Sequence, residues 1–311
     1  MSTPDKYVSG GVKFFAETAF DFDEFTAVVG VKPTGIRPSN DTSNSKWARW
    51  DYELESKGEP SVDALLSQLE RAVGSRAGAI GEYCASHGIH AWVWSYVEAP
   101  MSDVPKLRLS NRVLELCGAV GAGVDIDLLV DDGEEPEPLE EWLASPPAED
   151  ETVYRIRVRA RIRFSSVVDM DALAAATGLA LSTDAPKEAS WCGEWAWETG
   201  TYTVLERALA VFVGRAAEVG KYCAERGISV SVAVDAKSGD DKSPALDVYR
   251  PEARMVAELG ADLLFNVSWC DAETEALYQE AKAVGAVNWN AGPGVPEARR
   301  TPDGSRQATS I

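Results

Sequence analysis

The sequence has little of what most catalytic and metal sites are built from. It holds only two histidines and five cysteines, and it contains no Cys-x-x-Cys, His-x-x-x-His or Gly-x-Ser-x-Gly pattern. Zinc sites and serine hydrolases depend on ligands or a nucleophile turn of that kind. The sequence therefore favours a protein that is not an enzyme and that holds no metal or cofactor.

Long apolar runs and an excess of basic residues are also missing. No stretch approaches the roughly 20 apolar residues that cross a bilayer, and the N-terminus has neither a basic start nor an apolar run. With 30 basic and 50 acidic residues, the formal net charge is −20, which disfavours nucleic-acid binding because that binding neutralises phosphates. We expect a cytoplasmic protein without a membrane partner.

A repeated segment organises the chain. The pattern Tyr-Cys-Ala-x-x-Gly-Ile occurs at 83–89 and again at 222–228, an offset of 139. In both places it ends a segment with apolar residues every three and four positions, which predicts an amphipathic helix running into a strand. A fixed internal offset is typical of duplicated structural units. Cys84 and Cys223 lie on the apolar stripe, so we expect buried free thiols.

The predicted fold class is α+β, with two similar units in the order β-α-β-α-β-β-α-β. Each unit is expected to form an antiparallel or mixed sheet with helices mainly on one face. Ten acidic residues and no Lys or Arg fall within 131–152, which we interpret as a linker. The predicted division is a first repeat over 1–130, the acidic linker over 131–152, a second repeat over 153–270, a helix and short strand over 271–289, and a disordered tail over 290–311.

Three motifs in the first repeat resemble a known family. They are the acidic start Asp21-Phe22-Asp23-Glu24-Phe25, the turn Gly30-Val31-Lys32-Pro33-Thr34, and Trp47-x-x-Trp50 before a long helix. Together they resemble the bacterial domain of unknown function 4279 over 8–130 and, through the repeat, over 154–269. The resemblance implies tandem copies with a divergent second one, because Gly178-Leu179-Ala180-Leu181 lacks the Pro-Thr pair. The family has no established catalytic residues.

An arginine stripe is the first candidate binding feature. Between 154 and 164, arginines alternate with Tyr, Ile, Val, Ala, Ile and Phe, so a strand would place all of them on one face. In one interpretation, cross-strand acids such as Glu194, Glu198 and Asp235 offset the charge. In the other, the face binds an anion or a partner. The candidates are Arg155, Arg157, Arg159, Arg161 and Arg163.

Tryptophans are the second candidate feature. Trp92 and Trp94 share one face of a predicted strand, and more large aromatics occur than one helical layer can cover. Core packing explains most of them, and the remainder would form an exposed patch that anchors a partner. The candidates in this patch are Trp47, Trp50, Trp191 and Trp195.

Two acidic pairs allow either a cation or a structural role. Asp21 with Asp23, and Asp125 with Asp127, could ligate a hard cation. A helix cap for the first pair and the outer face of a strand for the second are the favoured interpretations.

Three functional hypotheses follow. The favoured one is a non-enzymatic bacterial protein-binding module, for example a toxin-neutralising immunity-type protein whose partner is encoded by a neighbouring gene. The alternative is a binding or enzymatic domain for an anionic small molecule that uses the arginine face. Single-stranded nucleic-acid binding by interleaved arginines and aromatics is the third, and the overall charge disfavours it.

Overall fold

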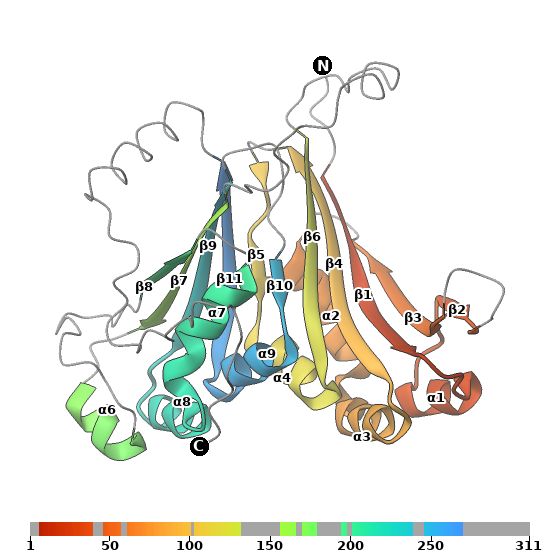
Figure 1. Ribbon diagram of the computed structural model, residues 1–311, viewed down its shortest axis with the longest axis horizontal. Coiled ribbons are helices and arrows are strands. Elements are labelled where there is room, and N and C mark those ends of the chain that lie inside the picture. The colour runs from red at the N-terminus through yellow and green to blue at the C-terminus, as the bar shows by residue number, and fades with distance from the viewer. Residues whose placement is uncertain are drawn as a thin grey trace, which may run out of the picture.

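Two mixed β-sheets lie side by side in the computed structural model, and helices pack against each (Figure 1). The fold is α+β. The structure describes residues 6–39, 46–56, 61–100, 103–131, 156–165, 170–178, 194–197, 201–238 and 246–269. Most of the predicted linker and the segments predicted over 271–289 and 290–311 lie outside these residues.

The first sheet is built almost entirely from the N-terminal half of the chain. Its strand order is β10-β6-β4-β1-β3-β2, with β4 and β6 parallel and the other neighbours antiparallel. The strands are β1 (Tyr7–Ala16), β2 (Gly35–Arg37), β3 (Ala48–Glu55), β4 (His90–Pro100), β6 (Ala122–Asp131) and β10 (Leu246–Val248). The accompanying helices are α1 (Phe22–Val29), α2 (Val62–Val73), α3 (Ala77–His87) and α4 (Asn111–Val120).

The second sheet has the order β5-β11-β9-β7-β8, with β9 and β11 parallel and the other neighbours antiparallel. Its strands are β5 (Leu107–Leu109), β7 (Ile156–Phe164), β8 (Glu194–Trp197), β9 (Val230–Ser238) and β11 (Ala261–Trp269). Its helices are α6 (Met170–Thr177), α7 (Thr201–Leu209), α8 (Ala216–Glu225) and α9 (Arg250–Glu258). In Figure 1, α7 lies in front of this sheet, whereas α2 lies behind the first sheet.

Local sequence signals determine where the first helix begins and ends. The Asp21 Oδ1 accepts hydrogen bonds from the backbone N–H groups of Asp23 and Glu24, both at 2.9 Å, so Asp21 is the N-cap of α1. Gly30 ends the helix with a φ of 79°, a conformation that favours glycine. This geometry supports the cap interpretation of Asp21 over cation binding.

The amphipathic helix that the sequence predicts before the pattern at 83–89 is interrupted. A 3-10 turn, η1 (Gly74–Arg76), separates α2 from α3. The turn directs Arg76 to the end of α1, where its Nη1 donates to the carbonyl oxygen of Ala27 at 2.7 Å. A guanidinium satisfies the carbonyls that a helix C-terminus leaves free, so a contact distant in sequence fixes the break.

Each half of the chain contributes one short strand to the other half's sheet. β5 precedes α4 in the sequence, yet it pairs with β11 in the second sheet. β10 precedes α9, yet it pairs with β6 in the first sheet. The helices that follow these strands, α4 and α9, pack against each other at the centre of the molecule (Figure 1). The order predicted from the sequence keeps every strand in the sheet of its own repeat, and the pairing of β5 and β10 differs from that prediction.

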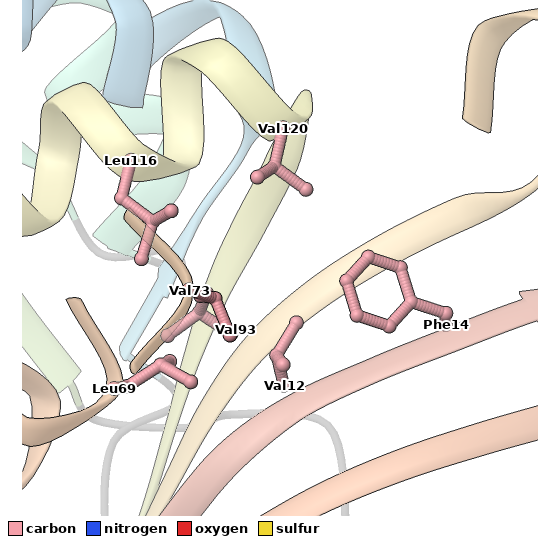
Figure 2. Close-up of a pocket in the computed structure, with 7 residues that line it drawn as sticks. All are labelled: Val12, Phe14, Leu69, Val73, Val93, Leu116 and Val120. Atoms are coloured by element: carbon pink, nitrogen blue, oxygen red, sulfur yellow. The ribbon is translucent and has the colours of Figure 1, made fainter. Parts of the chain in front are cut away.

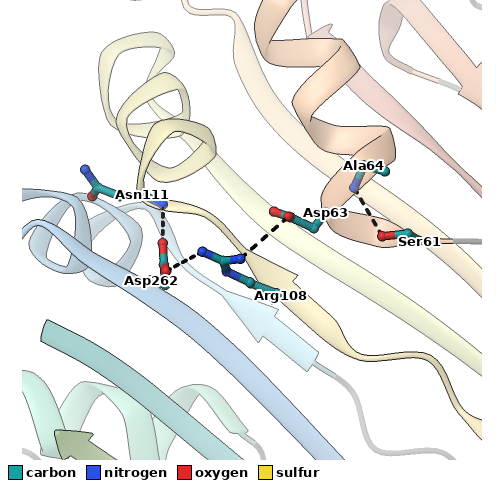
Figure 3. A network of polar contacts seen from close by, with 6 residues as sticks. All are labelled: Ser61, Asp63, Ala64, Arg108, Asn111 and Asp262. Carbon is teal, nitrogen blue, oxygen red and sulfur yellow. Dashed lines mark hydrogen bonds and ion pairs between the residues drawn. The ribbon is translucent and has the colours of Figure 1, made fainter. Parts of the chain in front are cut away.

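Polar contacts hold the exchanged strand β5 in place. The Arg108 Nη2 donates to the Asp262 Oδ2 at 2.6 Å, and its Nη1 lies 4.0 Å from the Asp63 carboxylate. The other oxygen of Asp262 accepts from the backbone N–H of Asn111, at the start of α4, at 2.9 Å. Figure 3 shows Arg108 between Asp63 of α2 and Asp262 of β11. Asp262 therefore ties both β5 and α4 to the second sheet.

Among the described residues, no helix combines the length and the apolar content needed to cross a membrane.

Candidate functional site

The first sheet has one face covered by α1 to α4 and one face that those helices leave uncovered, which we call the open face. Val12 and Phe14 of β1 are buried on the covered face, whereas Lys13 and Phe15 alternate with them on the open face. Strand register places Lys13 between Asp51 of β3 and Trp92 of β4. Directly paired residues share a face, so the open face brings together side chains from several strands.

One end of the open face carries an aromatic cluster. Phe15 lies edge-to-face with Trp47, at 5.4 Å between ring centroids, and stacks on His90 at 5.7 Å. The Trp47 side chain keeps an exposed fraction of 36 %. Its ring is thus oriented by neighbours and still accessible, as expected of an anchor residue.

The centre of the open face is formed by two tryptophans and a lysine. The Lys13 Nζ lies 4.1 Å from the ring centroid of Trp94, a cation–π contact. Burial, followed by the charge of Arg49, lowers the pKa of Lys13, and the charges of Asp51, Asp125 and Glu53 oppose that shift. The positive charge of Lys13 therefore interacts with the Trp94 ring and with carboxylates of the same sheet.

Trp92 lies over the neighbouring strand. A Cβ added to Gly123 would be 3.0 Å from the Trp92 ring, so this glycine provides the space that the ring occupies. Tyr249, the N-cap residue of α9, lies edge-to-face with Trp92, at 5.8 Å between ring centroids. The C-terminal half of the chain thus reaches the border of the open face.

Two carboxyl groups meet where the exchanged strand joins the first sheet. Asp125 of β6 and Asp247 of β10 are directly paired, and their side chains are hydrogen-bonded to each other. Burial raises the pKa of both groups, and for Asp247 the charge of Asp125 and the shared hydrogen bond raise the pKa further. Two carboxylates this close repel each other when both are ionised, so the pair is more stable when one proton is held between the two side chains.

Asp247→Asn is expected to make the protein more stable near pH 7. A group with a raised pKa in the folded state contributes stability below its unfolded pKa of 3.8 and loses that contribution as pH rises through the folded value. An amide keeps the donor at every pH, so the gain should be about 1 kcal/mol at pH 7, the worth of one hydrogen bond, and should vanish near pH 4. Urea unfolding across this range measures it.

Glu82→Gln is the control for that experiment. Glu82 is exposed in α3, away from the carboxyl pair, so its replacement should change the unfolding free energy little at either pH. An equal loss of stability for Asp247→Asn at all pH values would contradict the shared proton.

The structure separates the tryptophan candidates. Trp50 is fully buried, lies edge-to-face with Phe14, and donates from Nε1 to the Thr26 Oγ1 at 2.9 Å. Burial removes Trp50 from the candidate surface and assigns it to the core, whereas Trp47 remains. Trp195 lies in β8, and Trp191 is outside the described residues.

The arginine stripe lies on β7, the strand between β8 and β9. Ala160, Ile162 and Phe164 are buried on one face of it and Arg163 is exposed on the other. The remaining candidates are Arg157, Arg159 and Arg161, whose strand positions alone are described, and Arg155, which lies outside the described residues.

Strand register places two arginines of the stripe opposite acidic residues. Arg159 is paired with Asp235 of β9, and Arg161 is paired with Glu194 of β8. Glu194 and Asp235 are two of the three acids that the sequence suggests for this role, and the third, Glu198, lies outside the described residues. Asp235 also accepts a hydrogen bond from the Asn266 Nδ2 at 2.7 Å.

Lys13, Phe15 and Asp247 complete the site and are not among the candidates that the sequence suggests. Lys13 and Phe15 alternate with core residues, and that alternation was the signal that could have placed them on the open face. Asp247 had no such signal, because its position beside Asp125 depends on the strand exchange.

Two cavities among the described residues differ in size and in lining. One of about 10 Å³ lies beneath the first sheet and is lined only by apolar side chains (Figure 2); a cavity of this kind stays dry. An open hollow of about 370 Å³ lies along α9, where Arg250, Arg254, Met255 and Glu258 line it. The Arg254 Nε donates to Glu258 at 2.9 Å, which offsets part of the positive charge there.

Reactive thiols and metal ligands are equally sparse in the described part of the chain. Cys84, Cys117 and Cys223 are buried free thiols, as predicted for the first and third. Burial raises the pKa of Cys84 and Cys117 to about 12, which keeps them protonated and unreactive. Among the described residues, no group of three or more His, Cys, Asp or Glu side chains could hold a metal ion.

Residues 12–131 match the family described as a domain of unknown function (DUF4279). The match spans the first sheet from within β1 to the end of β6 and supports one copy of the domain. It includes every residue of the open face described above except Asp247 and Tyr249. No curated protein and no solved structure matches the chain.

Proposed function

We propose that the protein is a non-enzymatic bacterial binding module whose partner is another protein, and that this partner docks on the open face. The observation that carries the proposal is the distribution of exposed apolar side chains. Six large hydrophobic side chains are exposed in the described residues, and four of them lie on or beside the open face. These four are Tyr7, Trp47, Leu129 and Tyr249. Exposed aromatic side chains grouped on one face are typical of protein interfaces.

The shape of the open face favours a protein over a small molecule. Its side chains project from neighbouring strands of one sheet, and the cavity beneath it holds about 10 Å³. Small-molecule pockets are usually concave and of roughly 300–1,000 Å³. A broad sheet surface presents its side chains to a partner of similar breadth.

A toxin-neutralising immunity-type role fits such a module. A protein of this kind acts by occupying its target in a stoichiometric complex, which requires a binding surface and no chemistry. The partner would be the product of a neighbouring gene and would be met in the cytoplasm. Buried thiols with raised pKa values suit a reducing compartment of this kind.

We further propose that the chain carries two divergent copies of one domain. The central strands follow the order β6-β4-β1-β3 in the first sheet and β11-β9-β7-β8 in the second. In both, the first two strands are parallel and the later neighbours antiparallel. This agreement supports duplication beside the repeated sequence pattern.

Co-expression of the tagged 311-residue chain with each neighbouring gene product tests the proposed function. We expect one product to co-purify at a fixed stoichiometry, as measured by size-exclusion chromatography with light scattering. Trp47→Ala should weaken that complex at least tenfold, about the effect expected of an interface anchor.

Val213→Ala is the matched control, because Val213 has an exposed fraction of 66 % and lies outside the open face. It should leave the affinity unchanged. Co-purification of no neighbouring product would overturn the binding function, and a complex that loses the same affinity with either variant would overturn the assignment to the open face.

A further inference from the structure

The end of the open face away from the aromatic cluster combines exposed apolar side chains with acidic ones. Tyr7 and Leu129 have exposed fractions of 42 % and 51 %, and the Tyr7 ring lies 6.2 Å from that of Tyr96. Register pairs Glu98 with both Tyr7 and Leu129. We call this group, together with Glu55 and Asp127, the acidic end: Tyr7, Glu55, Tyr96, Glu98, Asp127 and Leu129.

The carboxylates of the acidic end are directed to solvent. Glu55, Glu98 and Asp127 are exposed, and they come from β3, β4 and β6. The Tyr96 hydroxyl donates to the Glu98 Oε2 at 3.4 Å. Burial, and then the charge of Glu98, raises the pKa of Tyr96. Three strands thus place negative charge around an accessible tyrosine pair and leucine.

The positive charges nearest the centre of the open face are already paired within the sheet. Lys13 lies against Trp94 and faces Asp51, Asp125 and Glu53. The Arg49 Nε donates to the Asp51 Oδ1 at 2.6 Å. These contacts leave the acidic end with carboxylates that a docking surface would have to match.

We infer that the acidic end of the open face docks a basic surface of the partner protein, with lysine or arginine side chains around an apolar centre. This inference rests on the proposed function and specifies the chemistry of its partner. An apolar centre on the partner would cover Tyr7 and Leu129, while cations would meet the three carboxylates. Complementary charge around an apolar contact sets orientation and speeds association.

The test uses the full chain and a defined probe. The probe is a fluorescein-labelled peptide in which Lys alternates with Leu, and its counterpart carries Gln in place of Lys. We expect the Lys peptide to bind the wild-type chain by fluorescence anisotropy, to weaken between about 50 and about 500 mM salt, and to bind at least tenfold more tightly than the Gln peptide.

Two triple variants locate the binding. Glu55→Lys, Glu98→Lys and Asp127→Lys together should weaken the Lys peptide at least tenfold. Glu82→Lys, Glu206→Lys and Glu218→Lys together alter three exposed helix positions and add the same six charges, two for each replacement. This control should stay within about twofold of wild type, since charge-dependent contacts at a distance are screened.

Several results would overturn the inference. An equal loss in both triple variants would mean that net charge alone attracts the peptide, and preference for the Gln peptide would remove the role of charge.

Where the first triple variant fails to fold by circular dichroism, Glu55→Gln, Glu98→Gln and Asp127→Asn remove the charges without reversing them and should weaken binding at least threefold. A neighbouring protein that binds through Trp47 and ignores the acidic end would retain the proposed function and refute this inference.

Discussion

Replacing Gly81 with alanine is expected to destabilise the protein by about 2 kcal/mol, within the range known for overpacked sites. Gly81 lies in α3 where that helix meets α4. A Cβ built on it would fall 2.1 Å from the carbonyl oxygen of Ala119. The obstacle is backbone, so a side-chain rotation cannot relieve it and the two helices would have to move apart. Chemical unfolding monitored by tryptophan fluorescence measures the loss.

Gly78→Ala provides the control within the same helix. Nothing lies within 4 Å of a Cβ at Gly78, and alanine is favoured over glycine in a helix by about 1 kcal/mol. This variant should therefore be more stable than wild type. A Gly81→Ala variant that is as stable as Gly78→Ala would show that α3 and α4 do not meet as closely as described.

Local structure was predictable because its causes are local. Asp21 caps the start of α1 and Gly30 ends it, and each residue type favours that role by itself. In β1, the alternation of apolar and polar residues indicates which side chains face the core. The continuous helix expected through Gly74 was wrong because the break accompanies a distant contact. Arg76 of the 3-10 turn donates to Ala27 at the end of α1, 49 residues earlier in the sequence.

The site was only partly predictable for a geometric reason. Trp47 and Trp50 belong to one Trp-x-x-Trp motif, but an odd spacing along an extended chain turns side chains to opposite faces. Trp50 accordingly packs in the core, and Trp47 contacts Phe15 on the open face. The two-residue period of a strand therefore assigns Trp47 and Trp50 to opposite faces of the sheet.

The strand exchange could not be derived from either half alone. β5 reads Leu-Arg-Leu and β10 reads Leu-Asp-Val, and an apolar-polar-apolar triplet fits the edge of either sheet. The choice goes with the packing of α4 against α9, the helices that follow these two strands, and that contact joins residues far apart in the sequence. The Asp125–Asp247 pair follows from that choice, so it was hidden for the same reason.

The exchange predicts that a substitution in the N-terminal half will loosen the second sheet. Leu107 of β5 is 1 % exposed and is paired with Phe265 of β11. Leu107→Ala should cost about 2–5 kcal/mol, as for other buried leucines. Its characteristic effect should be local. Native-state hydrogen exchange should accelerate in β11 more than in β1 or β3, because β5 is the strand that covers the β11 edge.

Ile80→Ala is the comparison that makes this result decisive. Ile80 is fully buried in α3, and its truncation to alanine should lower the free energy of unfolding by a similar amount. Exchange should then accelerate around α3 and the first sheet, with β11 less affected than in Leu107→Ala. If both variants gave the same exchange pattern, unfolding would be global at both sites. If Leu107→Ala accelerated β1 and β3 and spared β11, β5 would belong to the first sheet and the exchange would be refuted.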